Sequence, residues 1–214
     1  MRVGRWAVLG AVLAAAGCTD PLVPSRSAIY PFADAFGDVF HWPVDRLPVH
    51  IYADPRGDLS ALVSRAVDLW ARQLLYGELK VVMVADSNHA DVIVRWADSV
   101  PPAATPDPGP PVKACGGVTQ GVLDGTGQAF AAPFETEISI LTGTVFTPEQ
   151  VAACVRRTTL HELGHSFGLF QETTDTLSAM RSPPLVAEPA AIDRRTIQVL
   201  YHTPATLAPP PRRP

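Results

Sequence analysis

The stretch His161-Glu162-Leu163-Gly164-His165, followed by Gly168, decides how the rest of this 214-residue chain is interpreted. It follows Thr147-Pro148-Glu149-Gln150, which has the features of a helix start: a threonine cap, proline at the first helical position and glutamine three residues after the cap. In a helix over 147–168, residues four apart project only about 40 degrees from one another. His161 and His165 therefore face the same way and can bind one metal ion.

Glu162 lies between the two histidines in sequence, at the edge of the face that they share. Zinc lowers the pKa of a bound water, and a neighbouring carboxylate can take the water proton and later deliver it. The pattern predicts a hydrolytic metal site with His161 and His165 as ligands and Glu162 as general base. The competing interpretation is a chance match on a surface helix. The capped helix start and the glycine at 168, where a helix can end in a sharp turn, argue against it.

The pattern His161-Glu162-x-x-His165-x-x-Gly168, with Ser178-Ala179-Met180 after it, resembles the metzincin clan of zinc metallopeptidases, in particular its matrixin-like group. The stretch 189–201, which ends in Ile-Gln-Val-Leu-Tyr, is similar to the C-terminal helix of matrixins. The resemblance implies an endopeptidase with one catalytic zinc ion and with Met180 in a methionine turn beneath the metal. It also implies a protein or peptide substrate, and residues 128–133 are expected to form the sheet edge that pairs with it.

The third ligand position departs from the clan's pattern. The clan has a histidine, sometimes an aspartate, three residues after the glycine, and this chain has Gln171. An amide oxygen is a poorer zinc donor than imidazole or carboxylate. Three interpretations stay open: Gln171 binds weakly, Glu172 or Asp175 replaces it, or the chain is a zinc-binding or protein-binding pseudo-peptidase without turnover. The presence of Glu162 favours a working site.

Two further comparisons concern other metal sites. In an ordinary zincin the third ligand is a glutamate from a later helix, here Glu188, but Gly168 and Met180 argue against that reading. The segment Asp124-Gly125-Thr126-Gly127 resembles the glycine-rich calcium loop of matrixins, which implies calcium there. It lacks the histidines of their second, structural zinc site, so a second zinc is not expected.

The N-terminus has the features of an export signal. Arg2 and Arg5 precede a short apolar stretch over 6–16, which is too short to span a bilayer. Ala15-Ala16-Gly17-Cys18 resembles the bacterial lipobox. We therefore expect residues 1–17 to be a signal peptide, Cys18 to carry acyl chains, and the protein to be an exported lipoprotein anchored to a bacterial membrane.

With Cys18 acylated, two cysteines remain, Cys115 and Cys154. An even pair in an exported chain is most simply a disulfide. The formal net charge of −4 and the absence of a basic run give no reason to expect nucleic acid as a partner, and a monomer is expected.

The order of apolar patterns predicts an α+β domain in which a twisted mixed sheet packs on an active-site helix and a second helix, with a C-terminal helix after the methionine turn. Residues 18–42 are expected to form a tether, 43–204 the matrixin-like domain, and 205–214 a Pro-rich tail. Strands are predicted at 47–53, 80–85, 91–96, 128–132 and 137–141, and helices at 59–74, 147–168 and 189–201.

Overall fold

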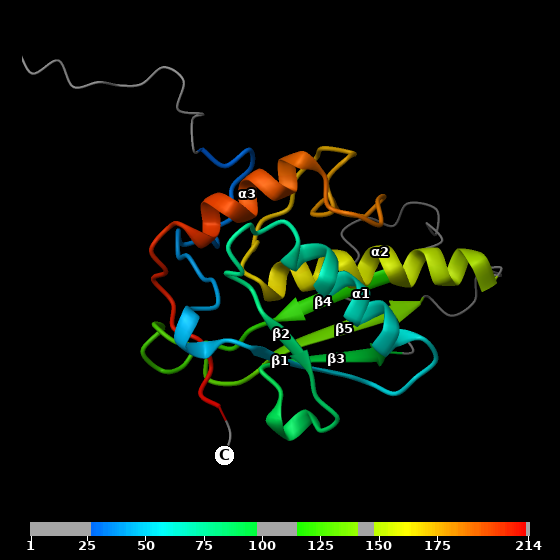
Figure 1. Ribbon diagram of the computed structural model, residues 1–214, viewed down its shortest axis with the longest axis horizontal. Coiled ribbons are helices and arrows are strands. Elements are labelled where there is room, and N and C mark those ends of the chain that lie inside the picture. Colours follow the sequence, from blue (N-terminus) through cyan, green and yellow to red (C-terminus); the bar gives the residue numbers. More distant parts are fainter. Residues whose placement is uncertain (1–26, 98–114, 141–147, 213–214) are drawn as a thin grey trace, which may run out of the picture.

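The computed structural model describes residues 27–97, 115–140 and 148–212, which form a mixed α/β fold with a five-stranded sheet (Figure 1). The strands are β1 (Val49–Ala53), β2 (Val81–Met83), β3 (Val92–Ala97), β4 (Cys115–Gln120) and β5 (Phe134–Ile140). The α-helices are α1 (Leu59–Ala71), α2 (Pro148–Ser166) and α3 (Ala191–Tyr201).

The strand order in the sheet is β2-β1-β3-β5-β4. β1, β2, β3 and β5 pair in parallel, whereas β4 runs antiparallel to β5 and forms one edge of the sheet. In that pairing Gly117 lies opposite Ile138, whose side chain is fully buried. The predicted mixed sheet is confirmed, and its antiparallel member is the strand nearest to α2.

The three helices lie on one side of the sheet (Figure 1). α1 packs on α2 and β1, and α2 packs on β4 and β5. Two buried indoles join α2 to the rest of the core: the Nε1 of Trp70 donates to the carbonyl of Leu160 at 2.8 Å, and that of Trp42 donates to the carbonyl of Ser166 at 2.9 Å. The helix that carries both histidines is thus held from two sides.

The segment between β3 and α2 differs from the prediction. Residues 128–132 form no strand; they are part of a turn in which the carboxylate of Asp124 accepts from the amide and the hydroxyl of Thr126. The sheet edge is β4 instead, so the expectation that 128–133 form the edge available to a substrate is wrong. The other predicted strands and helices are present, with ends that differ by a few residues.

The buried core includes residues that precede and residues that follow the predicted domain, 43–204. Tyr30, Phe40 and Trp42 are buried in the core, and so is Leu207 near the C-terminus. The backbone amide of Leu207 donates to the carbonyl of Val39, which ties the two terminal segments to each other.

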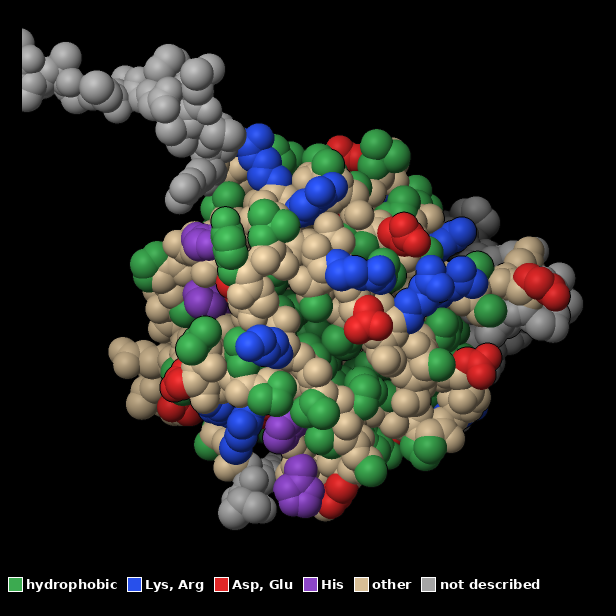
Figure 2. Space-filling view, viewed as in Figure 1, with side chains coloured by type: hydrophobic (Ala, Val, Ile, Leu, Met, Phe, Trp, Pro, Cys, Tyr) green, Lys and Arg blue, Asp and Glu red, His purple; other side chains and the backbone are tan. Residues whose placement is uncertain are grey.

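The described residues contain no helix that is long and apolar enough to cross a membrane. On the face shown in Figure 2, basic, acidic and hydrophobic side chains are intermingled. Cys18 and the expected signal peptide lie outside the described residues.

Candidate metal centre

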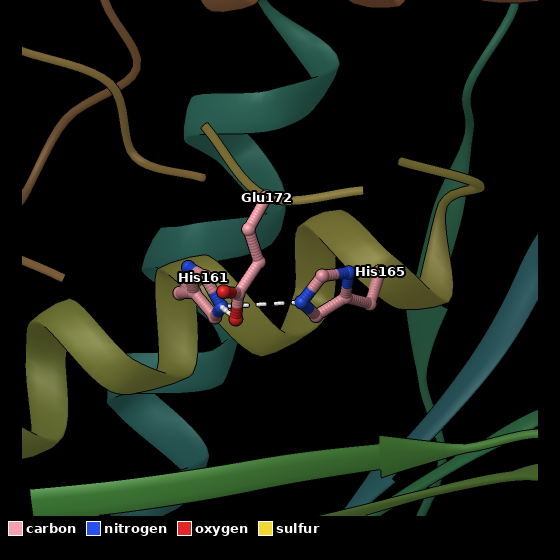
Figure 3. Close-up of side chains that lie close together, drawn as sticks. All are labelled: His161, His165 and Glu172. Carbon is pink, nitrogen blue, oxygen red and sulfur yellow. Dashed lines mark hydrogen bonds and ion pairs between the residues drawn. The ribbon is translucent and has the colours of Figure 1, made fainter. Parts of the chain in front are cut away.

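Three side chains from two neighbouring segments converge beside α2. His161 and His165 project from successive turns of the helix, and Glu172 reaches them from the segment that follows it (Figure 3). The two Nε2 atoms lie 3.1 Å apart, and Oε1 of Glu172 lies 3.6 Å from Nε2 of His161. One ligand atom from each of the three side chains lies within 4.8 Å of the others.

Both imidazoles are oriented by backbone carbonyls. Nδ1 of His161 lies 2.9 Å from the carbonyl oxygen of Ala179, and Nδ1 of His165 lies 2.6 Å from that of Leu169. Each ring can therefore donate its Nδ1 proton outward and direct the Nε2 lone pair to the common centre, as metal-binding histidines do. Two ligands at zinc–nitrogen distances of 2.0–2.1 Å and a tetrahedral angle are about 3.4 Å apart. The observed spacing of the Nε2 atoms fits a shared ion.

The turn after α2 brings Glu172 back to the histidines. Gly168 has a φ of +103°, and a Cβ built there would lie 1.9 Å from the carbonyl oxygen of Phe40. Both the backbone conformation and the close approach require glycine. This reversal of the chain brings the carbonyl oxygen of Leu169 to Nδ1 of His165. It also brings Glu172 back alongside His161.

The three residues left open as the third ligand occupy different positions. Glu172 has its carboxylate beside His161. The exposed Asp175 accepts a hydrogen bond from the amide of Leu177 at 2.9 Å and caps a turn. Gln171 is half-buried, and it is not among the residues that line the cavity at the centre.

Met180 lies beneath α2 and is fully buried. A Cβ at Gly164 would lie 2.3 Å from the sulfur of Met180, so any side chain at position 164 would clash with this methionine. The residue before Met180 supplies the carbonyl that holds His161. The turn therefore packs on the helix and orients His161.

The turn is itself held by Asp193, which lies in the first turn of α3 and is fully buried. Its Oδ2 accepts from the amide of Ala179 at 2.9 Å, and its Oδ1 accepts from the hydroxyls of Ser178 and Tyr30. Asp193 was not among the predicted site residues. The signal that could have found it is that Asp193 is the one acidic residue of α3.

Glu162 lies under the edge strand and is 4% exposed. Its Oε2 accepts from the hydroxyl of Thr119 on β4 at 2.9 Å. A Cβ at Gly117 would lie 2.5 Å from Oε1 of Glu162, so this glycine provides the room for the carboxylate. Burial raises the pKa of Glu162 to about 6.

The histidines differ in their affinity for a proton. Burial lowers the pKa of His165 to about 4, which keeps its imidazole neutral, as a ligand must be. Burial also acts to lower the pKa of His161, but the hydrogen bond with Glu172 and the charge of Glu162 outweigh it and raise that pKa. The hydrogen bond with His161 in turn lowers the pKa of Glu172. The carboxylates of Glu162 and Glu172 thus favour a positive charge at His161.

A cavity of about 390 Å³ opens beside this centre. The residues that line it include Glu162, His165 and Glu172, together with Gly117, Val118 and Thr119 of β4. No family model and no curated protein sequence matches this chain. Among solved structures with a similar arrangement is one titled "Structure of myroilysin", with 10% sequence identity and a TM-score of 0.41. The superposed parts cover 73% of this chain and 93% of that one.

Cys154 lies on α2 and is disulfide-bonded, and Cys115 is the first residue of β4. The side chain of Cys115 lies outside the described part of the structure, so its pairing with Cys154 stays a prediction.

Proposed function

We propose that the protein is a zinc-dependent endopeptidase of metzincin type, with His161, His165 and Glu172 as the protein ligands and Glu162 as the general base. One observation carries the proposal: the two Nε2 atoms lie 3.1 Å apart beside the carboxylate of Glu172, and the Nδ1 atom of each ring lies at a backbone carbonyl. A site of two histidines and one carboxylate is a common ligand set of catalytic zinc.

When bound there, zinc would acidify a water molecule and polarise a peptide carbonyl. The chain's own part is proton transfer. Thr119 holds Oε2 of Glu162 from β4, and we assign proton uptake to Oε1. The protonated carboxyl then delivers its proton to the amine of the leaving peptide, so the base ends the cycle as it began.

The substrate would bind as an extended strand. The outer edge of β4 lies next to Glu162, and a peptide can add to a free sheet edge by backbone hydrogen bonds. Strand addition places a peptide bond above the carboxylate without requiring a particular side chain.

We further propose export, a lipid anchor on Cys18 and a monomeric state, which rest on the sequence alone. We also propose, again from the sequence alone, that calcium binds at the loop that begins with Asp124. In the structure the Asp124 carboxylate accepts hydrogen bonds from the amide and the hydroxyl of Thr126 within its own turn.

The deciding experiment measures zinc per chain and cleavage of a generic peptide mixture by the purified protein and by Glu162→Gln. We expect Glu162→Gln to keep its zinc and to lose about 100- to 10,000-fold in turnover, because it removes the base but no ligand. Glu135→Gln, on the exposed face of β5, is the matched control and should behave like the unaltered protein. Zinc binding without any cleavage would favour the alternative, a binding protein without turnover, for which Gln171 at the clan's ligand position is the supporting feature. Equal turnover in Glu162→Gln would refute the assignment of the base.

A further inference from the structure

Three hydroxyl groups form a continuous chain behind the carboxylate of Glu162. Oγ1 of Thr119 lies 3.1 Å from Oγ1 of Thr136, which in turn lies 3.2 Å from Oγ of Ser166. Thr136 and Ser166 are fully buried, whereas Thr119 is half-buried. Of the three, Thr119 is the one that lies beside the carboxylate, at 2.9 Å from Oε2 of Glu162.

The sheet and the helix of the metal centre bring these hydroxyls together. Thr119 on β4 and Thr136 on β5 are direct partners in the antiparallel pairing, so their side chains lie on the same face of the sheet. Ser166 is the last residue of α2, which packs on both strands. The chain of hydroxyls therefore runs from the edge strand across its neighbour and back to the helix that carries Glu162.

The acceptors within reach decide where each hydroxyl proton goes, because a hydroxyl has only one proton to donate. Thr119 has two acceptors on Glu162, the backbone carbonyl and the carboxylate Oε2, both at 2.9 Å. Ser166 donates to the same carbonyl at 3.3 Å. Since Ser166 supplies the carbonyl with a hydroxyl donor, the Thr119 proton is available to the carboxylate, which is the stronger acceptor when it is ionised.

Thr136 completes the chain. Its hydroxyl lies within hydrogen-bond distance of both Thr119 and Ser166 and can donate to either oxygen. Donation to Thr119 makes the Thr119 hydroxyl a better donor to the carboxylate, because successive hydrogen bonds polarise one another. The chain thus acts on the orientation of Glu162 without adding a charge to the site.

We infer that Thr136 and Ser166 are positioning residues for the general base. They act through Thr119, whose proton they direct to Oε2 of Glu162, and this leaves Oε1 for proton uptake. The inference rests on the proposed function, since it concerns the base of the same reaction.

Steady-state kinetics of Thr136→Val test the inference, because this substitution keeps the shape of the side chain and replaces the hydroxyl by a methyl group. We expect kcat to fall by about 2- to 10-fold with KM unchanged, the effect of one neutral hydrogen bond on the transition state. Ser166→Ala should lower kcat in the same range. Thr136→Ser keeps the hydroxyl and should keep kcat. An unchanged kcat in both Thr136→Val and Ser166→Ala overturns the inference.

A double-mutant cycle separates positioning from a general effect on packing. If Thr136 acts through Thr119, the Thr136→Val substitution should have no further effect on kcat in a protein that already carries Thr119→Val. An equal effect in both backgrounds overturns the inference, because it would mean that Thr136 acts on the reaction without Thr119.

Thr159→Val is the matched control on α2. Thr159 is fully buried, and its hydroxyl has no hydrogen-bond partner among the described residues. The variant makes the same chemical change two residues before His161 but removes no hydrogen bond, so kcat should stay unchanged. A fall in kcat equal to that of Thr136→Val would show that any such change beside the centre suffices, which overturns the inference.

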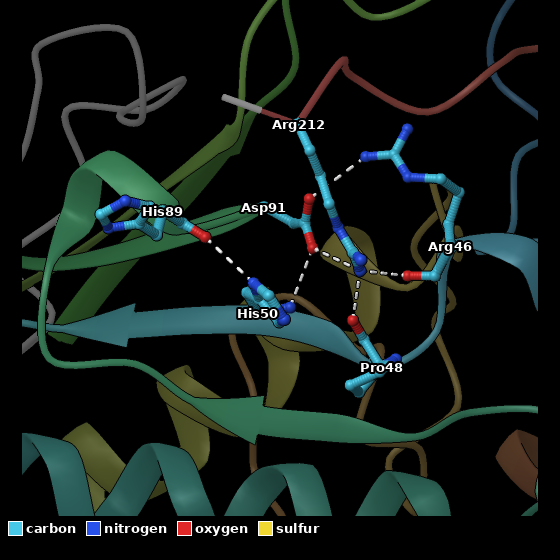
Figure 4. A network of polar contacts seen from close by, with 6 residues as sticks. All are labelled: Arg46, Pro48, His50, His89, Asp91 and Arg212. Atoms are coloured by element: carbon cyan, nitrogen blue, oxygen red, sulfur yellow. Dashed lines mark hydrogen bonds and ion pairs between the residues drawn. The ribbon is translucent and has the colours of Figure 1, made fainter. Parts of the chain in front are cut away.

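A second control tests the loss of a buried polar contact far from the hydroxyls. Arg46 donates to the buried carboxylate of Asp91 at 3.3 Å, in a network that also includes Arg212 (Figure 4). None of these three residues lines the cavity at the metal centre. Arg46→Ala should therefore lower the midpoint of urea unfolding and leave kcat unchanged. If kcat falls as much as in Thr136→Val, lost stability explains both variants and the inference is overturned.

A spectroscopic measurement separates this inference from the proposed function. In protein labelled with carbon-13 at its glutamate carboxyl groups, the Glu162 signal is identified by its loss in Glu162→Gln. We expect this signal to shift in chelator-treated Thr136→Val at pH 8, because the hydrogen bond from Thr119 is weakened, and to stay in place in Thr159→Val.

The two readouts together decide between the possible outcomes. A shifted signal without cleavage by any variant supports the positioning and overturns only the proposed function. Cleavage by the unaltered protein without a shift in Thr136→Val overturns the inference and leaves the function standing. If neither cleavage nor a shift is found, both are overturned.

Discussion

The hydroxyl of Thr119 lies 2.9 Å from both the carboxylate Oε2 and the backbone carbonyl of Glu162. One side chain thus connects the edge strand β4 to the helix that carries the histidines. It fixes the orientation of the carboxylate that we assign as the base, although Thr119 itself holds no metal.

Replacing Thr119 by valine should therefore lower kcat more than it changes KM. Loss of a hydrogen bond to a charged group costs about 1.5–3 kcal/mol, which corresponds to a reduction of roughly 10- to 100-fold if it falls on the transition state. Steady-state kinetics and zinc content should be measured together, with Thr119→Ser as the variant that keeps the hydroxyl. An unchanged kcat in Thr119→Val would show that the carboxylate needs no such support.

The third ligand can be identified by metal retention. Glu172→Ala should lose zinc to a mild chelator, because it removes the carboxylate that lies 3.6 Å from His161. Gln171→Ala and Asp175→Ala should retain zinc, and they serve as neighbouring controls. Loss of zinc in Gln171→Ala with retention in Glu172→Ala would instead favour the position that the clan uses.

In the metal-free protein, the burial of Glu162 should make the free energy of unfolding depend on pH. Burial raises the pKa of this carboxyl from 4.5 to about 6. The folded state thus binds the proton more tightly, and stability from this group is complete below pH 4.5 and is lost as the pH rises through 6. At pH 8 the chelator-treated Glu162→Gln should exceed the unaltered protein by about 2 kcal/mol in its free energy of unfolding, and the gap should shrink towards pH 4. Urea titrations at both pH values measure it, and a gap that widens towards acid would contradict the assigned direction.

Tyr30→Phe should destabilise the fold, because it removes a buried donor to the Asp193 carboxylate at 2.9 Å. A hydrogen bond to a charged group contributes about 1.5–3 kcal/mol, which urea unfolding can resolve. Tyr76→Phe makes the same chemical change at a residue that is 83% exposed and should have no comparable effect. Equal stability of both variants would mean that Asp193 holds its turn without Tyr30.

The predicted pairing of Cys115 with Cys154 would tie the edge strand to α2. Closing a loop of about 40 residues is worth roughly 3 to 4 kcal/mol in the chain-entropy account. Peptide mapping of the unreduced protein should recover the two cysteines in one linked fragment, and reduction should lower the unfolding midpoint. A fragment linking Cys154 to Cys18 would disprove the pairing.

The elements that sequence predicted correctly are those whose own residues carry the signal. The apolar period of α1 and the helix-start pattern before α2 are local features, and the five-residue stretch with both histidines has a fixed geometry on any helix. The strands β1, β2 and β3 are short and rich in Val and Ile, which sequence shows clearly. These features need no knowledge of the distant parts of the chain.

The missed features all depend on tertiary contacts. β4 contains Gly116 and Gly117, which weaken strand propensity, yet the strand forms because it pairs with β5. The missing side chain at Gly117 leaves room for the Glu162 carboxylate. The position of Glu172 beside His161, one of the candidates that the sequence left open for the third ligand, depends on how tightly the chain turns after Gly168. Leu207 lies in a Pro-rich segment whose composition resembles a free tail, but it is buried. Its amide donates to the carbonyl of Val39, and the next residue, Ala208, bonds with Gln128 and Phe130.

Asp193 also bears on the order in which the site can be assembled. It lies 14 residues after Ala179, whose amide it binds and whose carbonyl orients His161. During synthesis both histidines leave the ribosome before this aspartate does, so the nascent chain carries the complete metal-binding pattern without the support that aims His161. The proposed ion could therefore be held in this geometry only after α3 has left the ribosome and packed on the turn that contains Ala179.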